Sequence, residues 1–293
     1  MRISKFSPVV YTILMLFLCA GLGACASKQA GSKHGSSAVM SSQEHEKLGD
    51  VLMSRQNYEM ALIQYNRSLE LDPHNKNVRY KTGLVHLQRE NNQQALSAFE
   101  SVADTDPEYA LAFEGKGLAY YNMRNYDQAH FNFLKALDLD PDLWKSRAYL
   151  GIIYDLRGKN HLAIEEYLMA IELNPEMGSL YNNLGVSYNM ISEFEKAVDA
   201  FRTALDLKFR DPAVYNNLGL ALSKTGRYNQ ALEAFRKAGP EAQAYNNLGC
   251  VFLNKSMYEE AVRAFEKAIE LDASFYVTAG ENLKKARIAL GEI

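Results

Sequence analysis

The sequence predicts an all-α protein in which one helical hairpin is repeated along most of the chain. A glycine recurs at intervals of 34 residues, with one final step of 30. An alanine follows each glycine by twelve residues, and an aromatic residue follows each alanine by four. Three matched positions at a fixed period of this size are typical of a helical solenoid. The glycines are Gly49, Gly83, Gly117, Gly151, Gly185, Gly219 and Gly249.

Each repeat unit is predicted to hold two helices, A and B, joined by a short turn. In the fourth unit, residues 144–157 predict helix A and residues 161–173 predict helix B. Asn174 and Pro175 end helix B, because the residue before a proline leaves the α region and proline lacks a donor. The sixth unit is four residues short and ends at Gly239 and Pro240. The units are 42–75, 76–109, 110–143, 144–177, 178–211, 212–241 and 242–275.

The repeated residues have packing roles, described here by their position within a unit. Glycine at position 8 and alanine at position 20 are expected where helices A and B cross, because larger side chains would push the helices apart. Aromatic residues at positions 11 and 24 are expected to fill the adjoining space. Residues 276–293 keep the helical period with Leu283, Ala286 and Leu290 on one face, which predicts a capping helix at the end of the array.

This pattern resembles the tetratricopeptide repeat (TPR) family, over residues 42–275. The resemblance implies a right-handed superhelix, or α-solenoid, of seven hairpins plus the capping helix. It also implies a concave face lined by helix-A positions 2, 5, 6, 9, 12 and 13. Some units depart from the family pattern: Phe209 and Ala273 stand where units 5 and 7 would have the terminal proline.

Composition and motifs favour a binding protein over an enzyme. The net charge of −3 comes with no basic stripe, so no nucleic-acid partner is expected. The chain lacks a GxSxG sequence, a P-loop and an HExxH sequence, and its histidines have no metal-ligand spacing. We therefore predict no catalytic residues, no metal, no cofactor and no small-molecule substrate.

The N-terminus has the features of an export signal, predicted over residues 1–24. Arg2 and Lys5 precede an uncharged stretch over 9–24, which is short for a transmembrane helix. Leu22, Gly23, Ala24 and Cys25 resemble the processing box of bacterial lipoproteins, which implies a lipid such as palmitate on Cys25 and a membrane partner for that anchor. The alternatives are an ordinary cleaved signal or an uncleaved anchor.

The residues after Cys25 bear on where the protein resides. Residue 26 is alanine, whereas aspartate there retains lipoproteins in the inner membrane of enteric bacteria. The resemblance therefore implies the bacterial outer membrane, at its periplasmic face. The small, polar composition of 25–41 predicts a flexible tether. With Cys19 removed and Cys25 lipidated, only Cys250 would remain, so no intrachain disulfide is expected.

The predicted concave face offers a candidate groove for protein partners. Units 5–7 carry tandem asparagines at positions 5 and 6, and position 9 is apolar in most units. These asparagines resemble the ladder with which peptide-binding TPR superhelices hold an extended backbone. The alternative is that they only cap turns of neighbouring units. The candidate residues are Asn182, Asn183, Asn216, Asn217, Asn246 and Asn247, with Leu84, Leu118, Ile152, Val186 and Leu220.

Charged and aromatic side chains occupy other parts of the same face. Lys47, Lys81 and Lys145 are too scattered for the carboxylate clamp that some TPR domains build at positions 2, 5 and 6. Units 1–3 carry acidic and aromatic side chains that form either a second contact site or a solvated surface. These are Glu46, Asp50, Tyr80, Leu111, Glu114 and Tyr121.

The combination of lipoprotein signal, tether and TPR array resembles the pilus-assembly lipoproteins, namely the tight-adherence (Flp) pilus TadD family and the type IV pilus pilotins. It implies a non-catalytic outer-membrane scaffold in pilus or secretin assembly. The alternative is an adaptor that recruits peptidoglycan-processing enzymes of the envelope.

Overall fold

The computed structural model describes residues 40–272 and 276–292, and within these residues every regular element is an α-helix. The predicted signal, Cys25, Ala26 and nearly all of the tether lie outside them. The helices are α1 (Ser42–Ser54), α2 (Tyr58–Leu71), α3 (Lys76–Gln88), α4 (Asn92–Thr105), α5 (Ala110–Asn122), α6 (Tyr126–Leu139), α7 (Trp144–Leu156), α8 (Asn160–Leu173), α9 (Gly178–Met190), α10 (Phe194–Asp206), α11 (Pro212–Lys224), α12 (Tyr228–Ala238), α13 (Glu241–Asn254), α14 (Tyr258–Leu271) and α15 (Tyr276–Leu290).

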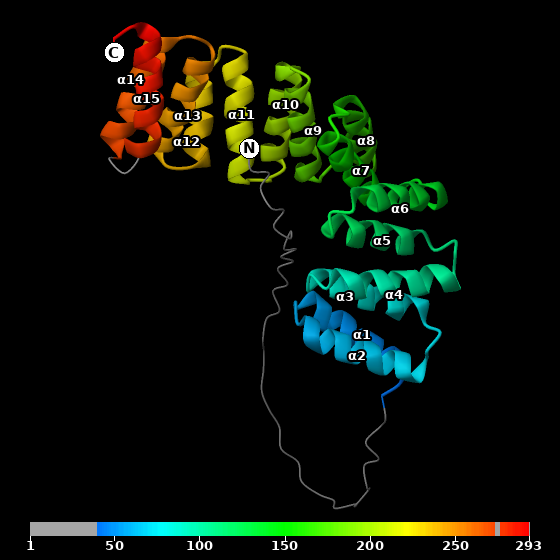
Figure 1. Ribbon diagram of the computed structural model, residues 1–293. Coiled ribbons are helices and arrows are strands. Elements are labelled where there is room, and N and C mark those ends of the chain that lie inside the picture. The colour runs from blue at the N-terminus through cyan, green and yellow to red at the C-terminus, as the bar shows by residue number, and fades with distance from the viewer. Residues whose placement is uncertain (1–39, 273–275, 293) are drawn as a thin grey trace, which may run out of the picture.

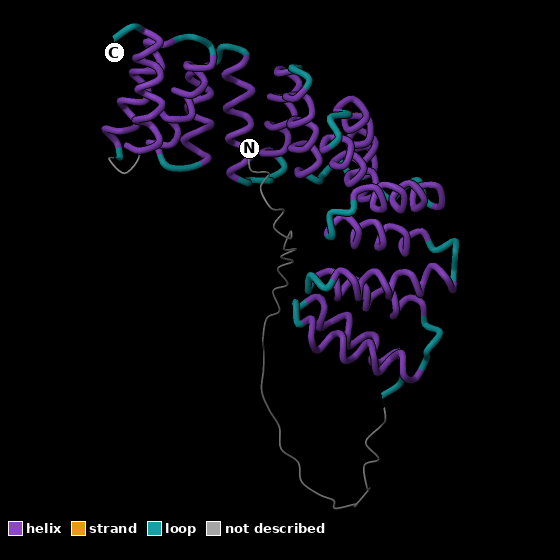
Figure 2. The backbone as a smooth tube through the Cα atoms, viewed as in Figure 1, coloured by secondary structure: helices purple, strands orange, loops and turns teal. Residues whose placement is uncertain are grey.

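The helices form successive A–B pairs that stack side by side into a curved array (Figures 1 and 2). Odd-numbered helices from α1 to α13 are the A helices, and even-numbered helices are their B partners. The array bends through an arc from α1 to α15, so it has a concave and a convex side (Figure 1). The all-α solenoid predicted from the repeat is confirmed.

The glycine at position 8 is needed because an aromatic ring lies against it. A Cβ placed on Gly151 would stand 2.6 Å from Tyr167 Cε1, and one on Gly117 would stand 2.6 Å from Phe133 Cδ1. Normal carbon–carbon contact is about 3.5–4.0 Å. The ring at position 24 of each unit therefore fills the space that a side chain at position 8 would occupy.

The turn between helices A and B uses one residue in the left-handed conformation. Gly158 (φ +69°) and Gly226 (φ +80°) hold this place in units 4 and 6. Gln56 and Glu90 hold it in units 1 and 2 with φ of 59°. Longer side chains are thus tolerated at this turn at some conformational cost.

Unit 5 ends differently from its neighbours because it has Phe209 where a proline would stand. Lys208 adopts a left-handed conformation (φ 64°), and Phe209 N donates to Ala204 O at 3.0 Å. The side chain of Phe209 then lies against Gly178, where a Cβ would be 2.6 Å from Phe209 Cβ. In the short unit 6, α12 has 11 residues, and α13 begins directly after Gly239 and Pro240.

The two ends of the array are not equivalent. Leu48 and Val51 are 36% and 45% exposed, whereas Leu150 and Ile153 at the same unit positions are fully buried. These positions pack against the preceding unit, and α1 has none before it among the described residues. At the other end, α15 buries Ala279 and Ala286, and Leu283 packs against the same core, as expected for a cap. Within the described residues, no helix is long and apolar enough to cross a membrane.

Candidate partner-binding groove

A hollow of about 280 Å³ shows which helix-A positions share the groove surface. It is bounded by positions 9, 12 and 13 of unit 1 and by positions 6 and 9 of unit 2. Residues at these positions in units 1 and 2 are therefore neighbours on one surface. Its lining residues are Asp50, Met53, Ser54, Tyr65, Lys81 and Leu84.

The asparagines of units 5–7 occupy helix-A positions 5 and 6, and one hydrogen bond joins two of them across neighbouring units. Asn247 Nδ2 donates to Asn216 Oδ1 at 3.2 Å, so position 6 of unit 7 meets position 5 of unit 6. Within unit 5, Asn182 Nδ2 donates to Asn183 Oδ1 at 3.3 Å. The amides at positions 5 and 6 thus lie close together across neighbouring repeats.

The tandem asparagines differ in how far they are open to a partner. Asn246 at position 5 is buried, at 8% exposure. Asn183, Asn217 and Asn247 at position 6 are half-buried. Asn182 and Asn216 at position 5 are half-buried as well. All three position-6 amides and two of the position-5 amides are therefore partly open to a partner, and Asn216 and Asn247 also contact each other between repeats.

Several amide oxygens on helix A are buried without a partner in the described part of the protein. They are Oδ1 of Asn182, Asn189 and Asn246. A buried acceptor without a hydrogen bond costs about 1–3 kcal/mol.

The apolar side chains at position 9 form a discontinuous ribbon. Leu84, Leu118, Ile152 and Val186 are half-buried, because each packs on the core between repeats. Leu220 is 43% exposed and is the most open of the five. Cys250 occupies the same position in unit 7, where burial raises the pKa of its thiol and Asn282 Nδ2 lies 3.5 Å from Sγ.

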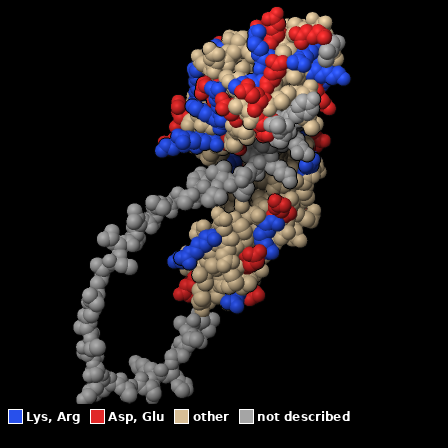
Figure 3. Space-filling model, turned by 90° about the vertical axis from the view of Figure 1, so that its left-hand side faces the viewer, with Lys and Arg blue, Asp and Glu red and all other residues tan. Residues whose placement is uncertain are grey.

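The acidic residues of units 1 and 2 are engaged within the molecule. Lys81 Nζ lies 2.7 Å from Glu46 Oε1 and 2.8 Å from Asp50 Oδ2. Lys81 therefore offsets one of these two negative charges, and Lys145 lies apart from them over the Trp144 ring. Figure 3 shows that charged side chains crowd the upper part of the molecule, while uncharged residues cover more of the lower part.

Glu114 is buried, whereas one of the two alternatives predicted from the sequence was a solvated side chain on the groove surface. It is 5% exposed, and its Oε2 accepts a hydrogen bond from Ser146 Oγ at 2.9 Å. Burial raises the pKa of the Glu114 carboxyl, against the opposing effects of Ser146 and Lys145. Burial raises the pKa values of the neighbouring Tyr80 and Tyr149, and the negative charge of Glu114 raises them further.

The sequence reasoning missed a polar network centred on Asp155 at position 12 of unit 4. Its carboxylate accepts hydrogen bonds from Ser187 Oγ (2.7 Å), Asn160 Nδ2 (2.9 Å) and Tyr167 OH (3.2 Å). These donors come from α8 and α9, so the network ties unit 4 to unit 5. Burial raises the pKa of Asp155, and the three donors oppose that shift.

A sequence signal for such networks existed in the aromatic at position 24. Only units 1 and 4 have tyrosine there, and both have an aspartate on helix A. Tyr65 OH donates to Asp50 Oδ1 at 2.8 Å, which matches the Tyr167–Asp155 contact. Tyrosine in place of phenylalanine therefore marks the units in which the buried ring needs a carboxylate partner.

Nothing in the described residues has the arrangement of a metal site, since no group of three His, Cys, Asp or Glu residues converges there. The geometry is instead that of a helical-repeat protein whose A helices carry amide, apolar and paired charged side chains.

Comparison with known proteins identifies the repeat. Family models of the tetratricopeptide repeat match residues 49–89, 110–143, 150–213, 212–238 and 242–275. The protein is therefore an array of tetratricopeptide repeats, as the sequence resemblance implied. Proteins of this kind are in general scaffolds for protein–protein interaction, and the partners implied by the fold are proteins. No curated protein matches the sequence.

Solved structures share the fold at low sequence identity. A tetratricopeptide repeat protein from Parabacteroides merdae has a TM-score of 0.55 at 16% identity, covering 84% of this chain and 98% of its own. The pilF protein of Pseudomonas aeruginosa has a TM-score of 0.54 at 20% identity, covering 68% of this chain and 92% of its own. MamA from Desulfovibrio magneticus has a TM-score of 0.51 at 21% identity, covering 56% and 92%.

Proposed function

We propose that this protein is a non-catalytic, outer-membrane lipoprotein that holds an extended segment of a protein partner in its TPR groove during pilus or secretin assembly. The observation that carries the binding role is the shared groove surface of positions 6, 9, 12 and 13. In units 5–7 this surface presents half-buried position-6 amides beside the exposed Leu220.

Amide side chains suit the binding of a peptide backbone. Each offers a donor and an acceptor, so it pairs with backbone carbonyl and N–H groups whatever the amino-acid sequence of the partner. Each such bond contributes about 1 kcal/mol net. Three of them would change the dissociation constant by roughly 150-fold, since 1.4 kcal/mol corresponds to a factor of ten.

The membrane location is part of the proposal and rests on the lipoprotein box that ends at Cys25. The fold likeness to pilF of Pseudomonas aeruginosa is compatible with the pilus role. Replacing Cys25 with Ser is expected to abolish metabolic labelling by a palmitate analogue and to release the protein from the outer-membrane fraction. Unchanged labelling and fractionation would contradict the lipid anchor.

The groove is tested by replacing Asn183, Asn217 and Asn247 together by Ala and comparing capture of envelope proteins with that of the wild type. Capture should weaken about 100-fold while the circular dichroism spectrum is retained. Replacing the exposed Asn229, which lies on helix α12 and outside the groove positions, is a matched control and should leave capture intact. Undiminished capture by the triple variant would place the binding surface elsewhere on the array.

The pilus role is tested in the cell. Deleting the gene should reduce surface pili and the amount of assembled secretin multimer, and the wild-type gene should restore both. Normal pili and normal multimers in the deletion strain would overturn that role, and altered peptidoglycan processing would favour the adaptor function.

A further inference from the structure

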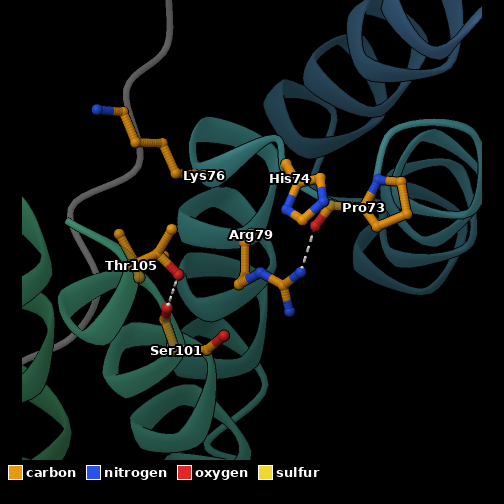
Figure 4. A pocket seen from close by; sticks show the side chains of 7 residues that line it. Pro73, His74, Lys76, Arg79, Ser101 and Thr105 are labelled. Carbon is orange, nitrogen blue, oxygen red and sulfur yellow. Dashed lines mark hydrogen bonds between the residues drawn. The ribbon is translucent and has the colours of Figure 1, made fainter.

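A small cationic pocket lies at the edge of the array, between units 1 and 2. Its volume is about 50 Å³, and it is formed by the loop before α3, the first turn of α3 and the last turns of α4. Figure 4 shows Arg79 between the loop and α4, with Ser101 below it and His74 beside it. The lining residues are Pro73, His74, Lys76, Arg79, Ser101, Val102 and Thr105.

Arg79 is anchored on one side of its guanidinium. Its Nη2 donates to the carbonyl oxygen of Pro73 at 2.6 Å. No carboxylate among the described residues lies within ion-pair distance of Arg79, whereas Lys76 is paired with Asp106 at 2.5 Å. The guanidinium is thus held in place by one hydrogen bond, and its other N–H groups are available to donate to an anion.

Unit 4 holds the same arginine with its anion in place. Arg147 stands two repeats after Arg79 and donates from Nη2 to the carbonyl oxygen of Pro141 at 3.1 Å. In addition, its Nη1 lies 3.4 Å from Glu166 Oε2 and 3.2 Å from Met169 Sδ. Both charged side chains of this pair are largely buried, at 18% and 15% exposure.

The pocket in unit 2 exists because the residues that fill this space in unit 4 have been replaced. Ala98 stands at the position of Glu166, and Ser101 stands at that of Met169. His74 also stands at the position of Asp142. The exchanges at Ala98 and Ser101 remove a carboxylate and a bulky side chain from beside the guanidinium, and the exchange at His74 removes a negative charge from the loop.

From this internal comparison we propose that the Arg79 pocket binds a carboxylate group supplied by another molecule, namely the acidic side chain of a protein partner. The carboxylate takes the position that Glu166 holds beside Arg147. Arg79 Nη1 and Ser101 Oγ donate to its two oxygens, and the pocket is large enough for the head group alone. The source named here rests on the proposed scaffold function, but binding of a carboxylate does not depend on that function.

The site differs from the groove in place and chemistry. Arg79 stands at position 4 of its repeat, whereas the groove is lined by positions 6, 9, 12 and 13. Position 4 meets position 23 in unit 1 as well, where His45 Nδ1 and Gln64 Oε1 are 2.8 Å apart. Contact between these two positions is thus a feature of the repeat, and unit 2 has the cation without its partner.

The test uses the full-length protein, dispersed in mild detergent, and two small probes titrated separately: N-acetylglutamate amide and inorganic phosphate. Binding is followed by the NMR signals of the Arg79 side chain and the Ser101 amide. The carboxylate probe should give a saturable shift in the wild type. In Arg79→Ala and in Ala98→Glu the affinity should fall at least tenfold.

The Ala98→Glu variant keeps Arg79 and its anchor on Pro73, so it separates loss of the site from loss of local structure. Arg89→Ala is the matched control, because it removes an exposed guanidinium at the end of α3 and should leave binding unchanged. A site that binds phosphate but not the carboxylate probe, a shift that persists in Ala98→Glu, or no saturable shift would each overturn the proposal. None of these outcomes depends on partner capture in the groove.

Discussion

Replacing Gly151 with Ala tests the role of the position-8 glycine and its link to the groove. The new Cβ would lie 2.6 Å from Tyr167 Cε1 and 2.8 Å from Tyr167 Cζ, about 1 Å closer than carbon atoms approach. Tyr167 is 1% exposed and its hydroxyl is bonded to Asp155, so the ring has little room to move. Overpacking of such a site costs about 3 kcal/mol at the upper end of its range.

Part of that cost is offset, because alanine is a better helix former than glycine by about 1 kcal/mol. The net expectation for Gly151→Ala is therefore a loss of about 2 kcal/mol. Moving the ring would also lengthen the Tyr167–Asp155 hydrogen bond and loosen the contact with Ser187 in the next unit. Local hydrogen exchange in α7 and α8 should accelerate more than exchange in α13 and α14.

A double-mutant cycle separates the steric term from other effects. In a Tyr167→Leu background the added methyl finds space, so Gly151→Ala should be neutral or stabilising there by up to about 1 kcal/mol. Stability is followed by urea unfolding together with hydrogen exchange, because repeat arrays do not always unfold in one step. Gly158→Ala is the control: it meets nothing within 4 Å, and its left-handed φ of +69° costs about 1 kcal/mol in both backgrounds. Equal losses from Gly151→Ala in both backgrounds would refute the reasoning.

Three further substitutions test burial. Burial raises the pKa of Glu114 above its ordinary 4.5, so the stability that its protonated form contributes is present below pH 4.5 and is lost as the pH rises through the folded pKa. Glu114→Gln cannot lose a proton, so its urea midpoint should rise relative to that of the wild type between pH 4 and pH 7. A difference in midpoint that stays constant over this range would contradict the raised pKa. Leu150→Ala should cost about 2–5 kcal/mol, because Leu150 is fully buried against the preceding unit, whereas Leu48→Ala at the same unit position should cost about 1 kcal/mol or less. Equal losses for Leu48 and Leu150 in urea unfolding would show that the face of α1 is covered.

The periodic residues were enough to predict the fold. The small residues at positions 8 and 20 and the large ring at position 24 pack together between helices A and B, so their spacing specifies the hairpin directly. The structure adds which atoms meet. Gly178, for example, lies against Phe209, a pairing that arises because unit 5 replaced its terminal proline.

The candidate site was less predictable, because periodicity places a residue on a face of its helix but does not show what the next repeat brings to it. Glu114 lay on the predicted groove face, yet Ser146 of the next unit and two tyrosines bury it. The Arg79 pocket was also beyond reach of the sequence pattern. Its recognition required the contact between positions 4 and 23, which only tertiary structure reveals.

The distribution of paired side chains favours units 5–7 as the binding half of the groove. In units 1–4 these carboxylates on helix A already have partners within the protein. Lys81 pairs with Glu46 and Asp50, Ser146 donates a hydrogen bond to Glu114, and three donors bond to Asp155. A ligand that binds there must first break these contacts and leave the buried Glu114 and the half-buried Glu46 and Asp155 carboxylates without partners, which costs more than a neutral exchange. The amides of units 5–7 are neutral, and those at position 6 are half-buried, so they can exchange one hydrogen bond for another at small cost. A peptide backbone is therefore expected to bind beside Asn217 and Leu220 before it binds beside Glu46.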